Sequence, residues 1–196
     1  MVPLGDVSAH PSELVGEGSR IAGPAQTEHH RPPGAVLVAC DKFKGSLTAR
    51  QVRDIAVGAL TAAGLPARGF LVADGGDGTL EACASAGFEL TPVDVSGPVG
   101  NRVQTAVARR DAAAVVELAD ACGLGRLPGG RLEPLTASSF GLGQAIRAAL
   151  TGAGEPPKRL VVGVGGSASS DGGLGLLAGL GAVLRDGAGR PLPPVL

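Results

Sequence analysis

The chain has 196 residues, of which 44% are hydrophobic and 18% charged, so its composition is that of a folded globular protein and not of a disordered chain. A net charge of −1 and the lack of Trp and Tyr disfavour nucleic-acid binding, which needs a basic surface and aromatic stacking platforms. We see no signal-peptide pattern, no long uninterrupted apolar run and no C-x-x-C pair among the three cysteines, so we expect a cytoplasmic protein with reduced thiols and no membrane span.

The first 33 residues differ in composition from the rest of the chain. They mix Gly, Ser, Pro, Glu and His without a sustained period and end in Pro32-Pro33. We expect residues 1–33 to be a disordered extension, with order beginning at Ala35.

A strand, a helix and a second strand are predicted between residues 35 and 73. The continuous apolar run 35–40 is typical of a strand buried on both faces. Thr48 and Gln51 fit a capping box that starts a helix, and Gly64 is a plausible end for it. The apolar stretch 70–73 then predicts the second strand, so the segment is a βαβ unit with a right-handed crossover.

The pattern changes after Gly87 and predicts a second domain of mixed α/β structure. We expect strands at 88–95, 103–108, 113–118 and 159–164, the first three antiparallel, with a further strand opening at 183. Helices are expected at 79–86, 138–150 and 176–180. The fold class is therefore α/β, with an N-terminal segment at 34–78 and part of a second domain at 79–196.

Three loops rich in glycine, acid and hydroxyl residues follow predicted strands. We name them loop 1 (residues 41–46), loop 2 (residues 74–79) and loop 3 (residues 163–173). Ligands of open α/β sheets bind at the carboxyl ends of strands, so all three loops are placed as a binding site requires.

Loops 1 and 2 combine charges that suit an anion and a metal ion. Loop 1 places an acid, two lysines and a serine before a helix N-terminus, where free N–H groups favour an anion. Loop 2 has two carboxylates that could hold Mg²⁺. The alternative is that both are ordinary turns with capping residues and solvated lysines.

Loop 3 has a composition suited to cradling phosphate, but it matches three motifs only imperfectly. It fits the dinucleotide pattern G-x-G-x-x-A, although serines and glycines occupy the turns where that helix should begin. It nearly matches a nucleophile elbow, yet Ser169 stands at the last glycine. A Walker A lysine is absent.

Histidines occur only at positions 10, 29 and 30, inside the predicted extension. A Ser-His pair or a histidine zinc site in the folded part is thereby disfavoured, and a general base must be a carboxylate or a lysine. Phosphoryl transfer to a small hydroxy-acid asks mainly for positioning and charge stabilisation, and it suits these loops.

The sequence resembles the glycerate kinases of the bacterial two-domain type. The resemblance is carried by VACDKFKGSLTA at 38–49, VADGGDGT at 72–79 and GVGGSASSDGG at 163–173. Weaker matches are ELADACGL at 117–124 and PLTASSFGLG at 134–143. The motifs occur in the family order and cover residues 35–196.

This resemblance implies a Mg²⁺-dependent transfer of phosphate from ATP to D-glycerate, in a cleft between a discontinuous flavodoxin-like domain and a domain inserted into it. It implies that Asp171 or Asp41 activates the glycerate hydroxyl, that Lys44 neutralises phosphate or carboxylate charge, and that Asp74 or Asp77 handles Mg²⁺. The implied substrate- and phosphate-binding residues are Ser46, Gly75, Gly76, Gly78, Thr79, Gly165, Gly166 and Ser167.

Family chains continue well beyond the length of this one, and their C-terminal part returns to complete the first domain. We therefore expect a truncated or split form whose βαβ segment has unpaired edges and low stability alone. Three hypotheses remain open: a glycerate kinase, a non-catalytic phosphate- or nucleotide-binding fragment, and a fragment that needs a partner chain supplying the C-terminal half.

Overall fold

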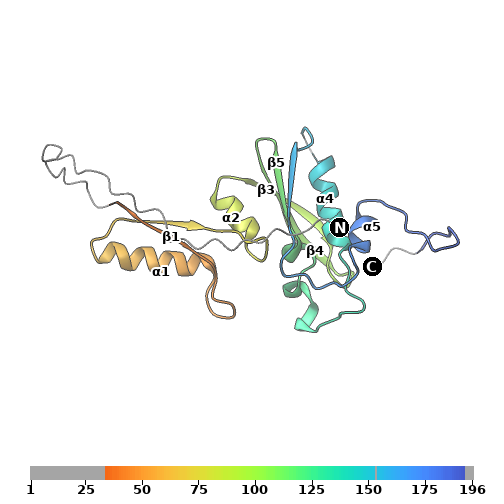
Figure 1. Ribbon diagram of the computed structural model, residues 1–196, viewed down its shortest axis with the longest axis horizontal. Coiled ribbons are helices and arrows are strands. Elements are labelled where there is room, and N and C mark those ends of the chain that lie inside the picture. Colours follow the sequence, from red (N-terminus) through yellow and green to blue (C-terminus); the bar gives the residue numbers. More distant parts are fainter. Residues whose placement is uncertain (1–33, 153, 193–196) are drawn as a thin grey trace, which may run out of the picture. The chain divides into compact units, whose positions relative to one another are not determined.

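The computed structural model describes residues 34–152 and 154–192, which belong to one compact unit spanning residues 33–196 (Figure 1). The predicted extension 1–33 lies outside the described residues. The predicted domain boundary at 78/79 falls within the unit and stays a prediction.

The described residues form an α/β structure with two separate sheets. The strands are β1 (Val36–Cys40), β2 (Ala67–Leu71), β3 (Glu89–Ser96), β4 (Arg102–Arg110), β5 (Ala113–Glu117) and β6 (Arg159–Gly163). The helices are α1 (Ala49–Ala62), α2 (Thr79–Ser85), α3 (Leu118–Cys122), α4 (Phe140–Thr151) and α5 (Leu174–Gly179), with 3-10 turns η1 (Leu124–Arg126) and η2 (Pro128–Gly130).

The first sheet confirms the predicted βαβ unit. Strands β1 and β2 pair in parallel, and α1 connects them. The capping box is present, since the Gln51 amide donates to Thr48 Oγ1 at 3.2 Å and the Thr48 amide donates to Gln51 Oε1 at 2.9 Å. The predicted bounds of the second strand, 70–73, are wrong: β2 pairs with β1 from Ala67 to Leu71, because backbone pairing and not apolar character sets the limits of a strand. Gly69 leaves room there for the Arg53 side chain of α1.

The second sheet has the strand order β3-β4-β5-β6. Strands β3, β4 and β5 are antiparallel, as predicted, and β6 joins β5 in parallel. The predicted strand at 183 is wrong. The chain there folds back on itself around Asp186, whose carboxylate accepts the Ala188 and Arg190 amides at 2.9 Å, so only an isolated bridge forms.

Helices cover both faces of the second sheet. One face packs against α4 through a core that includes Val107, Val116 and Leu142. The other face packs against α2 through a smaller cluster that includes Leu80 and Val115. This alternation follows from the two-residue period of the strands, and it gives residues 79–180 a core of their own.

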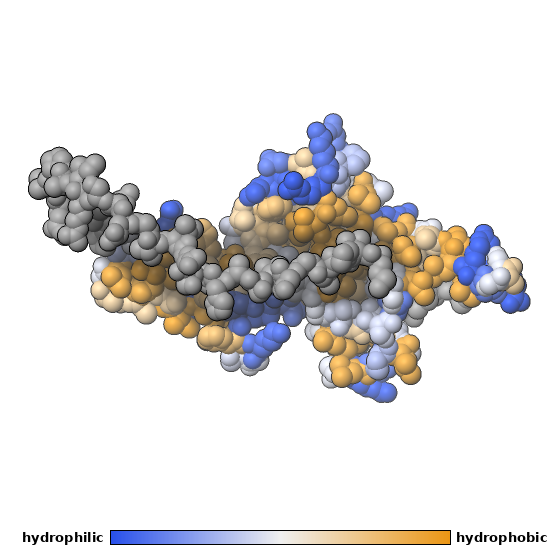
Figure 2. All heavy atoms as spheres, in the orientation of Figure 1, coloured by the Kyte–Doolittle hydropathy of each residue, from blue (hydrophilic) through white to orange (hydrophobic). Residues whose placement is uncertain are grey.

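The βαβ segment has no comparable core. Helix α1 contains no buried residue, and Leu37, Ile55 and Phe70 are exposed by 68%, 61% and 50%. Figure 2 shows hydrophobic residues at the surface over this helix. Two strands and one helix are too few to bury their own apolar faces. None of the described helices is long and apolar enough to cross a membrane.

Helices α4 and α5 approach each other through glycines. A Cβ atom at Gly143 would overlap the carbonyl oxygen of Leu176 and lie 2.9 Å from the Cα atom of Gly179. A Cβ atom at Gly179 would overlap the carbonyl oxygen of Phe140. The two helices can therefore pack this closely only because both positions lack a side chain.

We predict opposite effects for alanine at two helical glycines. Gly143→Ala should lower the free energy of unfolding by about 1–3 kcal/mol, because the added methyl group forces α4 and α5 apart. Gly58→Ala, in α1, meets nothing within 4 Å and should raise it by up to about 1 kcal/mol through helix propensity. Urea unfolding followed by circular dichroism measures both. Equal effects of the two substitutions would contradict this account of the α4–α5 contact.

Candidate functional site

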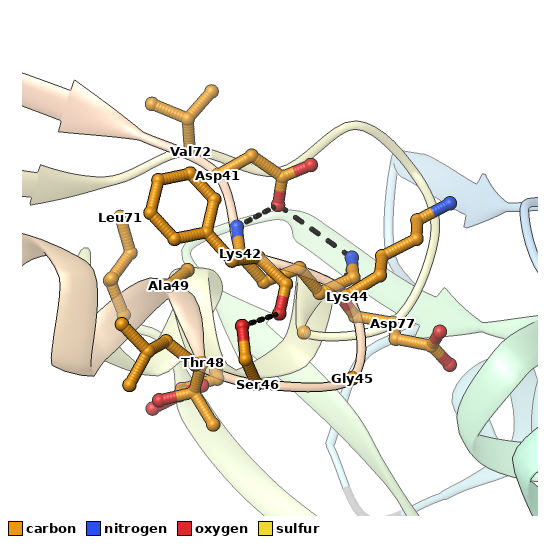
Figure 3. A pocket seen from close by; sticks show the side chains of 14 residues that line it. Asp41, Lys42, Lys44, Gly45, Ser46, Thr48, Ala49, Leu71, Val72 and Asp77 are labelled. Atoms are coloured by element: carbon orange, nitrogen blue, oxygen red, sulfur yellow. Dashed lines mark hydrogen bonds and ion pairs between the residues drawn. The ribbon is translucent and has the colours of Figure 1, made fainter.

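Loops 1 and 2 line one cavity of about 390 Å³ (Figure 3). Of the predicted site residues, the structure places Asp41, Lys44, Ser46, Asp77 and Gly78 at its wall. Strands β1 and β2 end near this cavity, and apolar side chains there add to its lining: Phe43, Leu71 and Val72. The start of α1 and Glu81 of α2 also line it. The cavity thus joins charged groups to an apolar wall.

The two lysines of loop 1 differ in their surroundings. The Lys42 side chain is 19% exposed, and its Nζ donates to the Asp77 carbonyl at 2.8 Å and lies 3.6 Å from Asp41 Oδ1 (Figure 3). It ties loop 1 to loop 2. Lys44 forms no hydrogen bond or ion pair with any residue that the structure describes, and it therefore remains available to an anion.

The two carboxylates of loop 2 also differ. Asp74 Oδ1 accepts the Gly76 amide at 2.8 Å, and this hydrogen bond, aided by the nearby charges of Lys42 and Lys44, lowers the pKa of Asp74. Asp77 has no hydrogen-bond donor on its carboxylate among residues 34–152 and 154–192. No group of three or more His, Cys, Asp or Glu side chains in these ranges could enclose a metal ion. Asp77 could therefore supply one ligand to a metal that other groups complete.

Glycines allow loops 2 and 3 to pack backbone against backbone. The Gly165 amide donates to the Gly75 carbonyl at 2.8 Å. A Cβ atom at Gly163 would lie 2.8 Å from the Gly75 oxygen, and one at Gly165 would lie 2.8 Å from the Gly76 Cα atom. These contacts account for the glycines at 163 and 165, and a φ of 87° accounts for the glycine at 75.

Hydroxyl groups in loops 1, 2 and 3 serve the loops themselves. Ser46 donates to the Phe43 carbonyl at 3.1 Å, and buried Thr79 donates to the Gly76 carbonyl at 2.7 Å. Ser167 Oγ accepts the Ser169 amide at 3.2 Å, and Gly166 has a φ of 72° that favours glycine. Such hydroxyls hold the loops in shape in the absence of a ligand.

Glu117, which was not among the predicted site residues, anchors the end of loop 2 through backbone amides. Its side chain ends β5 at 3% exposure, and its carboxylate accepts the Gly78 amide at 3.1 Å and the Leu80 amide at 2.8 Å. Burial, and to a lesser extent the charges of Asp120 and Asp77, raise the pKa of Glu117 despite these hydrogen bonds. The sequence signals were a carboxylate closing an otherwise apolar strand and the motif ELADACGL, which begins at this residue.

Asp171 lies at the start of α5 and holds it to the start of α4. Its carboxylate accepts the Ser139 amide and hydroxyl, both at 2.8 Å, the Gly173 amide at 3.0 Å and the Gly175 amide at 3.1 Å. Burial alone would raise its pKa, but these hydrogen bonds lower it. Asp171 is not among the residues that line the cavity of loops 1 and 2.

The carboxylates of Glu117 and Asp171 predict pH dependences of opposite sign. Because the pKa of Glu117 is raised above its ordinary 4.5, its contribution to stability is present at lower pH and is lost as the pH rises through the raised value. Because the pKa of Asp171 is lowered below 3.8, its contribution is present above 3.8 and is lost as the pH falls through the lowered value.

We therefore expect the stability advantage of the native chain over Glu117→Gln to shrink as the pH rises above 4.5, and its advantage over Asp171→Asn to shrink as the pH falls below 3.8. Urea unfolding across this range measures both advantages. Parallel pH profiles for the two variants would refute the assignment.

Comparison with known proteins places these motifs in one family. The model of the glycerate kinase family matches residues 36–196. A glycerate kinase of Neisseria meningitidis is 35% identical over 161 residues, and a glycerate 2-kinase of Escherichia coli is 34% identical over 169 residues. A crystal structure described as glycerate kinase 2 of Salmonella typhimurium is 36% identical, with a TM-score of 0.64.

These matches cover about four fifths of this chain and less than half of each relative. The shares are 81% of the chain and 43% of the Neisseria relative, 80% and 42% for the Escherichia relative, and 81% and 43% for the Salmonella structure. With a family model matched from β1 onward and the three loops in place, the chain belongs to the glycerate kinase family.

Proposed function

We propose that this chain supplies the phosphate- and metal-binding part of a glycerate kinase, which transfers the γ-phosphoryl group of ATP to D-glycerate. The observation that carries the proposal is the cavity between loops 1 and 2, where Lys44, Asp41 and Asp77 line one wall. Phosphoryl transfer needs a cation for the phosphate, a carboxylate for the hydroxyl and a ligand for Mg²⁺, and this wall offers all three.

Lys44 is the group that we assign to the phosphate. Its ammonium has no partner among the described residues, whereas Lys42 is committed to Asp77 and Asp41. A cation that is not already paired gives its full charge to an incoming phosphate, and loop 1 precedes the N-terminus of α1, whose dipole adds to the attraction.

Asp41 is the carboxylate that we assign to the glycerate hydroxyl. Its side chain is 56% exposed at the cavity, and Lys42 keeps it oriented through an amide hydrogen bond of 2.7 Å. Asp171, the other candidate, already accepts hydrogen bonds from Ser139, Gly173 and Gly175 that lower its pKa, and it does not line this cavity. The Escherichia relative is a glycerate 2-kinase, and we propose the same hydroxyl here.

Asp77 is the residue that we assign to Mg²⁺, with Asp74 beside it. Mg²⁺ is usually held by one or two carboxylates together with substrate phosphates and water, and not enclosed by protein alone. The open Asp77 carboxylate on the cavity wall fits that arrangement. When bound, the ion would neutralise phosphate charge.

We further propose that a polypeptide equivalent to the remainder of the family chain completes the βαβ segment. The chain spans about 43% of the relatives it matches, and the apolar side chains of β1, α1 and β2 are largely exposed. A partner that pairs with the edge of this two-stranded sheet would bury them. Without this polypeptide, the chain would bind phosphate or nucleotide without catalysing the transfer. That is the alternative function, a non-catalytic binding fragment.

We predict that ADP release from Mg-ATP and D-glycerate requires the complementing polypeptide. The test compares this chain alone with the chain mixed with the portion of the Neisseria relative outside its matched 161 residues. Turnover should appear only in the mixture, and Asp41→Asn should lower it by about a hundredfold or more because the base is lost. Turnover by the chain alone would refute the need for a partner. Unchanged turnover of Asp41→Asn would refute its role.

A second prediction concerns Lys44 and does not require turnover. Lys44→Gln should weaken Mg-ATP binding by about tenfold, because one charge-assisted contact to phosphate is lost. Its thermal stability should stay unchanged, since the lysine has no partner among the described residues. Arg68→Gln removes the same charge from β2 and is the control. Calorimetric titration measures the Mg-ATP affinity of both variants. Equal affinities of Lys44→Gln and Arg68→Gln would contradict the assignment of Lys44 to the phosphate.

A further inference from the structure

A second cavity, of about 360 Å³, lies at the opposite end of the four-stranded sheet from loop 2. It is lined by residues of the β4–β5 turn, the start of β6 and the residue before β3: Phe88, Arg110, Asp111, Ala112, Ala113, Lys158 and Arg159. Strand β5 runs from this cavity at Ala113 to the loop 2 anchor at Glu117. The second cavity is therefore separate from the site described above.

The strand register places two arginines on either side of an alanine. Arg110 of β4 pairs with Ala113 of β5, and Ala113 pairs with Arg159 of β6. Paired residues of neighbouring strands project from the same face, and two strand spacings separate the arginine backbones by about 10 Å. The short side chain of Ala113 leaves the space between the two arginines open.

Arg110 is held in position by two contacts that leave donors free. Its Nη1 donates to the Ala86 carbonyl at 2.6 Å, and its guanidinium lies 4.6 Å from the centre of the Phe88 ring. A guanidinium has five N–H donors, so several remain for a ligand. Because the side chain is already ordered, binding costs less conformational entropy.

The charges around the cavity are unbalanced. Six arginines elsewhere in the described ranges form ion pairs with carboxylates. Arg110, Lys158 and Arg159 form none with any described residue. All three line one cavity, whose only carboxylate is that of Asp111. Like charges gathered in this way attract an anion, and planar guanidinium groups match the oxygens of phosphate.

We propose that this cavity is a second anion site, which binds a phosphate group clamped between Arg110 and Arg159 with Lys158 at its rim. The phosphate is either inorganic or carried as a monoester by a small molecule. The site does not depend on the proposed kinase activity, since it shares no residue with the cavity of loops 1 and 2.

The test is a titration of the isotopically labelled full chain with inorganic phosphate and with methyl phosphate, followed by amide NMR. Saturable shifts are expected at residues 110–113 and 158–159 with both probes. Tighter binding of methyl phosphate assigns the site to an organic phosphate, and equal or tighter binding of inorganic phosphate assigns it to the free ion. Shifts confined to loops 1, 2 and 3 would overturn the proposal.

Variants then distinguish specific binding at this cavity from nonspecific attraction of phosphate by positive charge. The double substitution Arg110→Gln and Arg159→Gln should weaken binding at residues 110–113 by about tenfold or more. Arg147→Gln removes an exposed arginine of α4 and should leave the affinity unchanged. Lys158 precedes β6 and takes no part in strand pairing, so Lys158→Gln should fold even if the double variant does not. This single variant should also weaken phosphate binding. Equal loss in Arg147→Gln, or no loss in the variants that fold, would overturn the proposal.

Discussion

The contact between the backbones of loops 2 and 3 is the constraint on which the site depends. The Gly75 carbonyl accepts the Gly165 amide, and a Cβ atom at Gly163 or Gly165 would lie 2.8 Å from backbone atoms of loop 2. This contact joins the end of the first sheet to the end of β6 in the second. Gly163 and Gly165 of loop 3 therefore have a structural reason that does not involve a ligand. Close packing of the two loops therefore explains these glycines as well as phosphate binding would.

Carboxylates acquire different properties around this contact. Glu117 is buried below loop 2 and holds two amides with a raised pKa, whereas Asp171 holds amides and a hydroxyl and has a lowered pKa. Asp41 and Asp77 remain open at the cavity wall. Burial without enough donors favours the protonated form, and burial with many donors favours the charged form. We propose the open pair for substrate and metal, whereas buried Glu117 and half-buried Asp171 hold backbone amides.

The two sheets differ in how far they complete a core. The four-stranded sheet buries side chains on both faces, under α4 on one side and α2 on the other. The two-stranded sheet leaves α1 without a buried residue. The hydrophobic effect scales with the area removed from water, so most of the stability of the described chain comes from residues 79–180. Loop 1, with Lys44 and Asp41, therefore belongs to the βαβ segment, which is the less stable part of the described chain.

Local patterns in the sequence were sufficient for the helix that Thr48 caps, for the antiparallel strands after Gly87 and for the three loops, because capping, alternation and loop composition depend on neighbours in the chain. The family motifs likewise identified the glycerate kinase family. Tertiary structure alone decided that Lys42 binds loop 2 while Lys44 stays free, that Glu117 anchors loop 2, and that Asp171 meets Ser139 across 32 positions of the chain. Identical side chains differ in availability through partners distant in sequence, and those partners are set by how the sheets and loops pack.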